Sequence, residues 1–113
     1  MPKRTMQAHS QIARRAATLL GRLIHIQRIE AKMPAAELAT RAGISRALLY
    51  RIEKGDPTCS IGAAFEAATI AGVPLFEDEG QHSLAEHLKQ SERELRLLPR
   101  AVRKPRKPVH DEF

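Results

Sequence analysis

The chain has 113 residues, which is enough for one small domain with its tails. Hydrophobic residues make up 42% of it, aromatic residues only 4%, and the formal net charge is +6. No run approaches the ~20 apolar residues of a membrane span, and a single cysteine excludes a disulfide framework or a cysteine-based zinc site. Abundant alanine with few aromatics favours close-packed helices, so we expect an all-α protein. The absence of a long apolar run and of a cysteine framework favours a location in the cytoplasm.

Charge is unevenly divided along the chain. Residues 11–55 carry nine basic and three acidic side chains, whereas residues 56–95 carry two basic and eight acidic ones. A cationic surface binds phosphates with release of counterions. We therefore expect residues 11–55 to face nucleic acid and the acidic part to face away from it. Residues 1–11 lack the apolar core of a signal peptide and are expected to form a flexible arm.

The segment 34–55 predicts two short helices joined by a tight turn. A helical run over Glu37–Ala42 is stopped by Gly43, which accepts a positive φ at little steric cost. Ser45 is suited to cap the next helix, because its hydroxyl can accept a hydrogen bond from a free N–H of the first turn. The second helix is expected from Arg46 to about Lys54. This arrangement predicts a helix-turn-helix.

The outward face of the second helix is expected to contain the residues that contact DNA. In such motifs the N-terminal residues of this helix contact base edges in the major groove. We expect Arg46 and Arg51 to read guanine bidentately and Ala47 to touch a thymine methyl group. Tyr50 would contact the backbone or a thymine, and Ser45 a phosphate. The alternative is that both arginines are simply solvated helix charges.

Residues 18–76 resemble the phage-repressor/Cro-like (XRE) helix-turn-helix family through the pattern AxxLAxxAGISxxxLxxIExG. The resemblance implies a lambda-repressor-like bundle of about five helices, a domain over residues 12–76, and an upstream helix from Leu19 to about Ala31. It also implies a semi-buried structural ion pair between Arg28 and Glu53. The position before the pattern's AELA is often glutamine in this family and is Ala35 here, so some backbone contacts must come from elsewhere.

A further helix is predicted from Ile61 to about Ala71, with Ser60 as its cap and Gly72 as its stop. Its apolar stripe comprises Ile61, Ala64, Phe65, Ala68 and Ala71. Leu75 and Phe76 then either complete the monomer core or supply the homodimer contact that the family resemblance implies, and both can hold. A homodimer would pair two motifs on a palindromic operator in double-stranded DNA.

Residues 77–98 are expected to form an acidic hinge and an extra C-terminal helix. Ser83 and Glu86 have capping-box spacing, and the helix would run from Leu84 to about Leu98 with its leucines on one face. Leu84, Leu88 and Leu95 are candidate dimer or partner contacts. The helix would extend the dimer, fold back on the core, or dock a partner.

The tail, residues 99–113, is basic and rich in proline and is predicted to be disordered. Nonspecific attraction to phosphates is its simplest role. The whole layout, from RIEKGDP to the acidic-aromatic end of the tail, resembles HipB-type antitoxins. That resemblance implies an antitoxin that represses its own operon and binds a HipA-like kinase toxin. The alternative is a stand-alone XRE-type regulator.

No pattern points to catalysis. The histidines lack metal-ligand spacing, and there is no glycine-rich phosphate loop or nucleophile motif. Cys59 lies near a helix start, a position that can lower the pKa of a thiol. The alternative is an inert cysteine. We expect no enzyme activity, no cofactor and no metal, and a sequence-specific DNA-binding repressor that is nucleoid-associated when bound. The predicted core comprises Leu20, Leu23, Ile24, Leu38, Ile44, Leu49, Ile52, Phe65, Ile70, Val73, Leu75 and Phe76.

Overall fold

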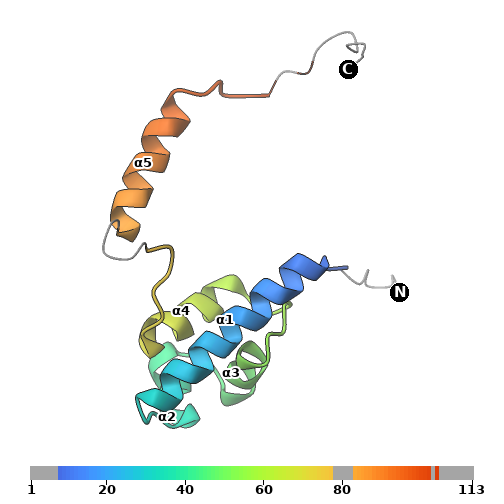
Figure 1. Cartoon of the computed structure of the whole chain (residues 1–113), viewed down its shortest axis with the longest axis vertical. Helices are drawn as coiled ribbons and strands as arrows, with labels where there is room; N and C mark the ends of the chain where they lie inside the picture. The colour runs from blue at the N-terminus through green and yellow to red at the C-terminus, as the bar shows by residue number, and fades with distance from the viewer. Residues whose placement is uncertain (1–7, 78–82, 103, 105–113) are drawn as a thin grey trace. The chain divides into compact units, whose positions relative to one another are not determined.

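The computed structural model describes residues 8–77, 83–102 and 104. These residues contain five helices and no strand (Figure 1). The helices are α1 (Gln11–Glu30), α2 (Ala35–Ala42), α3 (Arg46–Glu53), α4 (Ile61–Ala71) and α5 (Leu84–Arg96). The predicted all-α class is therefore confirmed for the described residues. The chain divides into two units, with the boundary between Leu75 and Phe76.

In the first unit, α1 packs against α3 and α4, and α2 packs against the same two helices. Figure 1 shows α1 as the longest of these four helices, lying across the others. It begins at Gln11, so the prediction of a start at Leu19 was wrong. The hydroxyl of Ser10 accepts a hydrogen bond from the Ala13 N–H at 3.0 Å, and the residues that follow are good helix formers.

The turn between α2 and α3 has the predicted chemistry. Gly43 adopts φ 73°, and the N–H of Ile44 donates to the carbonyl of Ala39 at 3.0 Å. A Cβ at Gly43 would meet nothing within 4 Å, so glycine is favoured by its φ alone. The Ser45 hydroxyl accepts from the N–H of Leu48 at 3.0 Å, which confirms the predicted cap of α3.

The core of the first unit lies where the four helices meet. Its buried apolar residues are Ile24, Leu38, Ala39, Leu49, Ile52, Ala67, Ala68, Ala71 and Val73. Partly buried residues that were also predicted for the core pack against it, namely Leu20, Ile44, Ile70 and Leu75. Four alanines belong to the core, so the helices approach one another closely. Phe65 is only half-buried.

Besides Phe65, three predicted apolar positions lie outside the core. Leu23 is 39% exposed because it is turned about 100° around α1 from the buried Ile24. Phe76 is 69% exposed, since its backbone turns to a φ of 58° directly after Leu75. Ile61 is also 69% exposed, because it is the first residue of α4 and projects past the packed part of the helix. The buried face of α4 instead includes Ala67.

Glycine brings α1 and α3 into backbone contact. A Cβ at Gly21 would collide with the carbonyl oxygen of Ile52 and lie 2.9 Å from that of Glu53. Only a residue without a side chain allows this approach. The contact fixes the C-terminal end of α3 against the middle of α1.

In the second unit, α5 has the predicted capping box. The Ser83 hydroxyl accepts from the Glu86 N–H at 3.2 Å, and the Glu86 carboxylate accepts from the Ser83 N–H at 3.0 Å. The helix ends at Arg96, slightly before the predicted end at Leu98. None of its residues is buried. The expected flexible arm, acidic hinge and disordered tail fall mostly outside the described residues. Among the described helices, none is long and apolar enough to cross a membrane.

Candidate DNA-binding interface

Helix α3 presents one side to the core and the other to solvent. Leu49 and Ile52 are 1% and 4% exposed, as expected for the inward side. The five predicted DNA contacts are all solvent-exposed, namely Ser45, Arg46, Ala47, Tyr50 and Arg51. A ligand can therefore approach all five from outside the bundle without unfolding it.

Arg51 is tied to the loop that follows α3. Its Nε donates to Oδ2 of Asp56 at 2.9 Å, and its Nη2 donates to the hydroxyl oxygen of Thr58 at 3.0 Å. The backbone N–H and hydroxyl of Thr58 and the Arg51 guanidinium lower the pKa of Asp56 to about 2. The Arg51 guanidinium is thus oriented, and this tether was not foreseen from the sequence.

Lys54 adds a positive charge to the exposed side of α3. Its Nζ lies 5.3 Å from the centroid of the Tyr50 ring, a cation–π distance. The two residues are one helical turn apart, and that spacing was the sequence signal for their contact. Lys54 was not among the predicted contacts.

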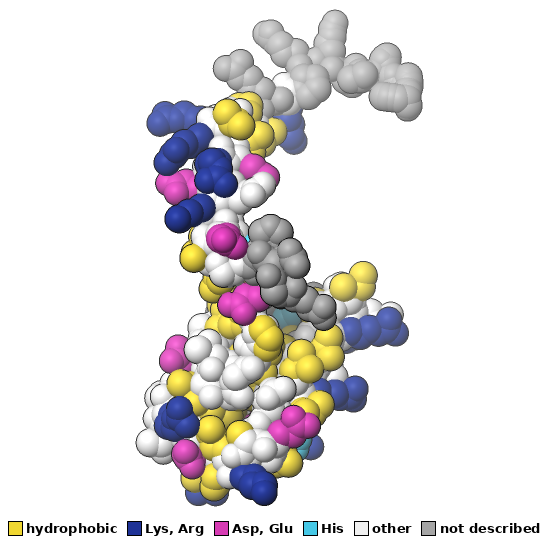
Figure 2. Space-filling model, turned by 60° about the vertical axis from the view of Figure 1, so that its left-hand side comes forward, with side chains coloured by type: hydrophobic (Ala, Val, Ile, Leu, Met, Phe, Trp, Pro, Cys, Tyr) yellow, Lys and Arg dark blue, Asp and Glu magenta, His cyan; other side chains and the backbone are white. Residues whose placement is uncertain are grey.

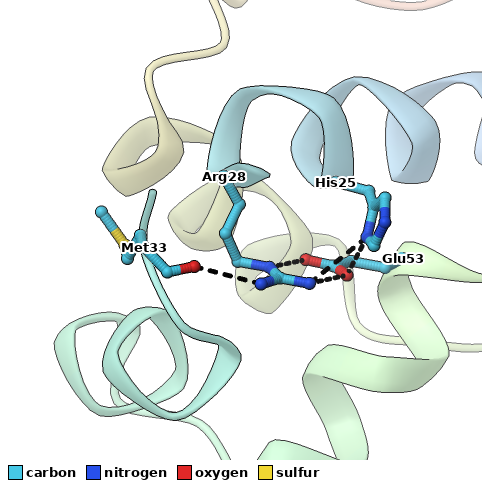
Figure 3. A network of polar contacts seen from close by, with 4 residues as sticks. All are labelled: His25, Arg28, Met33 and Glu53. Atoms are coloured by element: carbon cyan, nitrogen blue, oxygen red, sulfur yellow. Dashed lines mark hydrogen bonds and ion pairs between the residues drawn. The ribbon is translucent and has the colours of Figure 1, made fainter. Parts of the chain in front are cut away.

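Arg28 and Glu53 join α1 to the C-terminal end of α3 (Figure 3). The Arg28 Nε donates to Oε2 of Glu53 at 2.8 Å, and Nη2 donates to Oε1 at 3.0 Å. A third donor, Nη1, reaches the carbonyl of Met33 at 3.1 Å. Arg28 is only 9% exposed. Its guanidinium therefore connects α1, α3 and the segment that leads into α2.

His25 completes this network and was not recognised from the sequence as part of it. Its Nδ1 lies 2.7 Å from Oε1 of Glu53 and 3.3 Å from Nη2 of Arg28 (Figure 3). A carboxylate only accepts hydrogen bonds, so the shorter contact requires Nδ1 to carry a proton and donate. The His25 side chain is 52% exposed, so it covers the outer edge of the ion pair. The one signal for it was its position three residues before Arg28 on the same helix.

The charges in this network stabilise one another. Burial raises the pKa of Glu53, but hydrogen bonds from Arg28 and His25 outweigh it, and the net pKa is lowered. The hydrogen bond to Glu53 raises the pKa of Arg28 despite the opposing effect of burial. Both side chains are therefore ionised at neutral pH, and their contact holds α3 in position.

A groove of about 870 Å³ runs between α1 and α3. Arg22 and His25 line it from α1, Arg46 lines it from α3, Lys54 lines it from the C-cap of α3, and Ala35 lines it at the start of α2. Ala35, the first residue of α2, contributes no polar side chain to this groove, and the acidic residue of the same turn is Glu37. The cationic residues that line the groove are on α1, on α3 and at the C-cap of α3.

The other predicted site residues fall into two groups. Leu75 packs against the core, whereas Phe76, Leu84, Leu88 and Leu95 are exposed by 40% to 69%. Desolvation by burial raises the pKa of the Cys59 thiol, which agrees with an inert cysteine and not with a thiol activated by the helix start. In the described part of the chain, no group of three or more candidate ligands could hold a metal ion.

A comparison with protein families identifies the fold family of this chain. The family model described as a helix-turn-helix domain matches residues 19–79, which is more than half of the sequence and includes α2, α3 and α4. No curated protein matches. The matched range contains the turn at Gly43, the exposed side of α3 and the Arg28–Glu53 pair, so family and geometry agree. The chain belongs to the helix-turn-helix domain family of DNA-binding proteins.

Proposed function

We propose that the protein is a sequence-specific transcriptional repressor that binds a palindromic operator as a homodimer. The observation that carries this proposal is the exposed side of α3, where polar and cationic residues begin at the N-terminal end of a helix that the Arg28–Glu53 pair attaches to α1. A protein of this kind acts by occupying DNA, so the proposal includes no catalytic step.

Each residue on this side has a proposed role. Arg46, at the first position of α3, donates bidentately to guanine O6 and N7, and Ala47 touches a thymine methyl group. Tyr50 contacts the DNA backbone or a thymine, and Arg51 reads a second base with the N–H groups that Asp56 and Thr58 leave available. Ser45 contacts a phosphate beside the helix N-terminus.

Phosphate contacts must also come from other residues. Ala35 cannot supply one through its side chain, and Arg22 and Lys54 line the groove between α1 and α3 with cationic groups. We assign them to the DNA backbone. In the same proposal, residues 12–76 form the DNA-binding domain, residues 77–98 link and pair the copies, and the basic residues 99–113 attract phosphate without sequence preference.

A binding selection tests the proposal. Purified protein is incubated with a randomised duplex library at physiological salt, and the retained DNA is sequenced over several rounds. The expected result is an inverted repeat with half-sites about one helical turn apart. Enrichment of no motif, or of a motif that Arg46→Ala enriches equally well, would overturn the readout by α3.

A narrower role is supported by the C-terminal layout. An exposed leucine-bearing helix followed by a basic segment resembles the arrangement in HipB-type antitoxins, so we propose as a second candidate the autoregulating antitoxin of a HipA-like kinase toxin operon. The neighbouring gene is the first test, since an adjacent HipA-like reading frame is required. Pull-down of that kinase by the full chain, and by a chain truncated after Pro99, would then locate the contact. Without such a neighbour, the stand-alone regulator remains.

A further inference from the structure

Helix α1 carries a row of apolar side chains on its outer face. Ile12 is 78% exposed, Leu19 58% and Leu23 39%, and the exposed Ala16 lies between the first two. The four residues follow one another at intervals of four, three and four positions, which is the spacing of a coiled-coil seam. We call Ile12, Ala16, Leu19 and Leu23 the α1 stripe. Apolar side chains that lie open between charged ones are visible over the surface in Figure 2.

The α1 stripe does not face the proposed DNA interface. At about 100° per residue, its centre lies about 110° around the helix from the buried Ile24. His25 and Arg28, which contact α3, lie on the opposite side of Ile24. A helix packed on the α1 stripe would therefore leave the exposed side of α3 accessible.

Helix α5 carries a matching row. Leu84, Leu88, Ser91 and Leu95 also follow at intervals of four, three and four, and none of them is buried. We call these four residues the α5 stripe. Because the two spacings are the same, both stripes have a length of about 16 Å. The intervals of four, three and four are the same in either chain direction. The two stripes can therefore pack on each other residue by residue in parallel or in antiparallel orientation.

We propose that the α5 stripe of a second copy of this chain packs antiparallel on the α1 stripe. In this register Leu23 lies opposite Leu84, and Leu19 lies opposite Leu88. Ala16 then faces Ser91, so the two small residues meet, and Ile12 faces Leu95. A parallel register would instead set Leu19 against Ser91 and leave an apolar side chain facing a hydroxyl.

The flanking charges agree with the antiparallel register. Arg15 borders the α1 stripe and would lie beside Glu94, which borders the α5 stripe. The parallel register would bring Arg15 to Glu92 instead, and that carboxylate already accepts from Arg96 at 3.0 Å. Two α1 helices facing each other would oppose arginines, since Arg15 and Arg22 both border the α1 stripe on the same side.

The choice of a second copy as the occupant rests on the proposed function, which needs two motifs on one operator. Reciprocal exchange of α5 between two copies produces two identical seams related by a twofold axis, as a closed symmetric dimer requires. A substitution in either stripe then changes both seams, so its effect on the free energy of dimerisation is doubled. The seams join two copies without using any residue assigned to DNA.

Disulfide trapping tests this pairing. In a Cys59→Ser background, a tagged Leu19→Cys chain is mixed with an untagged Leu88→Cys chain and oxidised mildly in the absence of DNA. The expected product is a disulfide-linked heterodimer, because facing positions of a helix pair come within disulfide reach. The register control mixes Ile12→Cys with Leu88→Cys, which lie two helical turns out of register and should not cross-link.

Three results would overturn the pairing. These are a cross-linked homodimer of Leu19→Cys alone, an internal disulfide in a monomeric chain carrying both cysteines, and equal cross-linking of the register control. A charge exchange gives independent evidence in solution. Arg15→Glu removes the ion pair from both seams and should raise the dimer dissociation constant by roughly two- to thirtyfold, and adding Glu94→Arg should restore it. Because these measurements contain no DNA, they can succeed even if the operator selection fails, and the reverse also holds.

Discussion

Arg28 and Glu53 form a two-pronged ion pair, with Nε 2.8 Å from Oε2 and Nη2 3.0 Å from Oε1, that attaches α3 to α1. The same guanidinium holds the Met33 carbonyl at 3.1 Å, so three segments depend on one side chain. Removing either charge would leave the other poorly hydrated in a site with little exposure to water. The pair therefore supports the position of α3 without touching any ligand.

Glu53→Gln should lower the free energy of unfolding by about 2–3 kcal/mol. The physical reason is that Arg28 loses its anionic partner while it remains nearly buried. Urea denaturation followed by far-UV circular dichroism measures the loss. The double variant Arg28→Met/Glu53→Leu removes both charges and should recover part of it. A Glu53→Gln variant as stable as wild type would show that the pair contributes nothing to folding.

Stability should fall in acid, and Glu53 should account for part of the fall. Its pKa in the folded protein lies below the ordinary value of 4.5, so the unfolded chain takes up the proton first. The contribution is complete above pH 4.5 and is lost as pH falls through the lower folded value. Urea midpoints at pH 7, 5, 4 and 3 on wild type and Glu53→Gln test this prediction. The pKa of Asp56 is also lowered, so Asp56 contributes to the acid sensitivity of both proteins. The contribution of Glu53 is therefore the difference between the wild-type and Glu53→Gln curves of urea midpoint against pH.

Gly21→Ala should destabilise the protein by about 2 kcal/mol, because the new Cβ would collide with the backbone of α3. Gly62→Ala is the matched control within another helix. A Cβ at Gly62 meets nothing within 4 Å, so this change should stabilise by up to about 1 kcal/mol through helix propensity. Thermal denaturation of both variants provides the comparison. Similar shifts in the two melting temperatures would contradict the close approach of α1 and α3.

Arg46→Ala should weaken operator binding by about 1–3 kcal/mol while binding to random duplex falls much less. The reason is that a bidentate guanine contact is specific to one base pair. Fluorescence anisotropy with the selected operator and a scrambled duplex of equal length measures both affinities. Arg41→Ala, on the exposed side of α2 and paired only weakly with Glu37 at 3.6 Å, is the charge-matched control. Equal losses for the two variants on both duplexes would assign Arg46 to nonspecific attraction.

The parts of the fold that depend on neighbouring residues could be predicted from the sequence. Ser45, Ser60 and Ser83 cap their helices as expected, and Gly43 and Gly72 end theirs in the left-handed region. Caps and stops follow from hydrogen bonds within a few residues, so the local sequence contains the necessary information.

Burial at the edges of helices could not be predicted in the same way. Leu23, Ile61 and Phe76 are as apolar as the core residues beside them, yet the direction of the packed face excludes them. Which face of α1 is buried depends on α3 and α4, which follow much later in the chain. The unrecognised contact of His25 with Glu53 has the same cause, since it joins residues 28 positions apart across two packed helices.

The tether of Arg51 has a consequence for the thermodynamics of recognition. An arginine that is free in solution loses rotamer entropy when it binds, and that loss opposes association. Asp56 and Thr58 restrict this guanidinium while the protein is still unbound, so most of the ordering occurs during folding. Any duplex that Arg51 contacts therefore meets a side chain that is already oriented. Release of the tether by Asp56→Ala would leave the charge of Arg51 intact and make its association entropically less favourable.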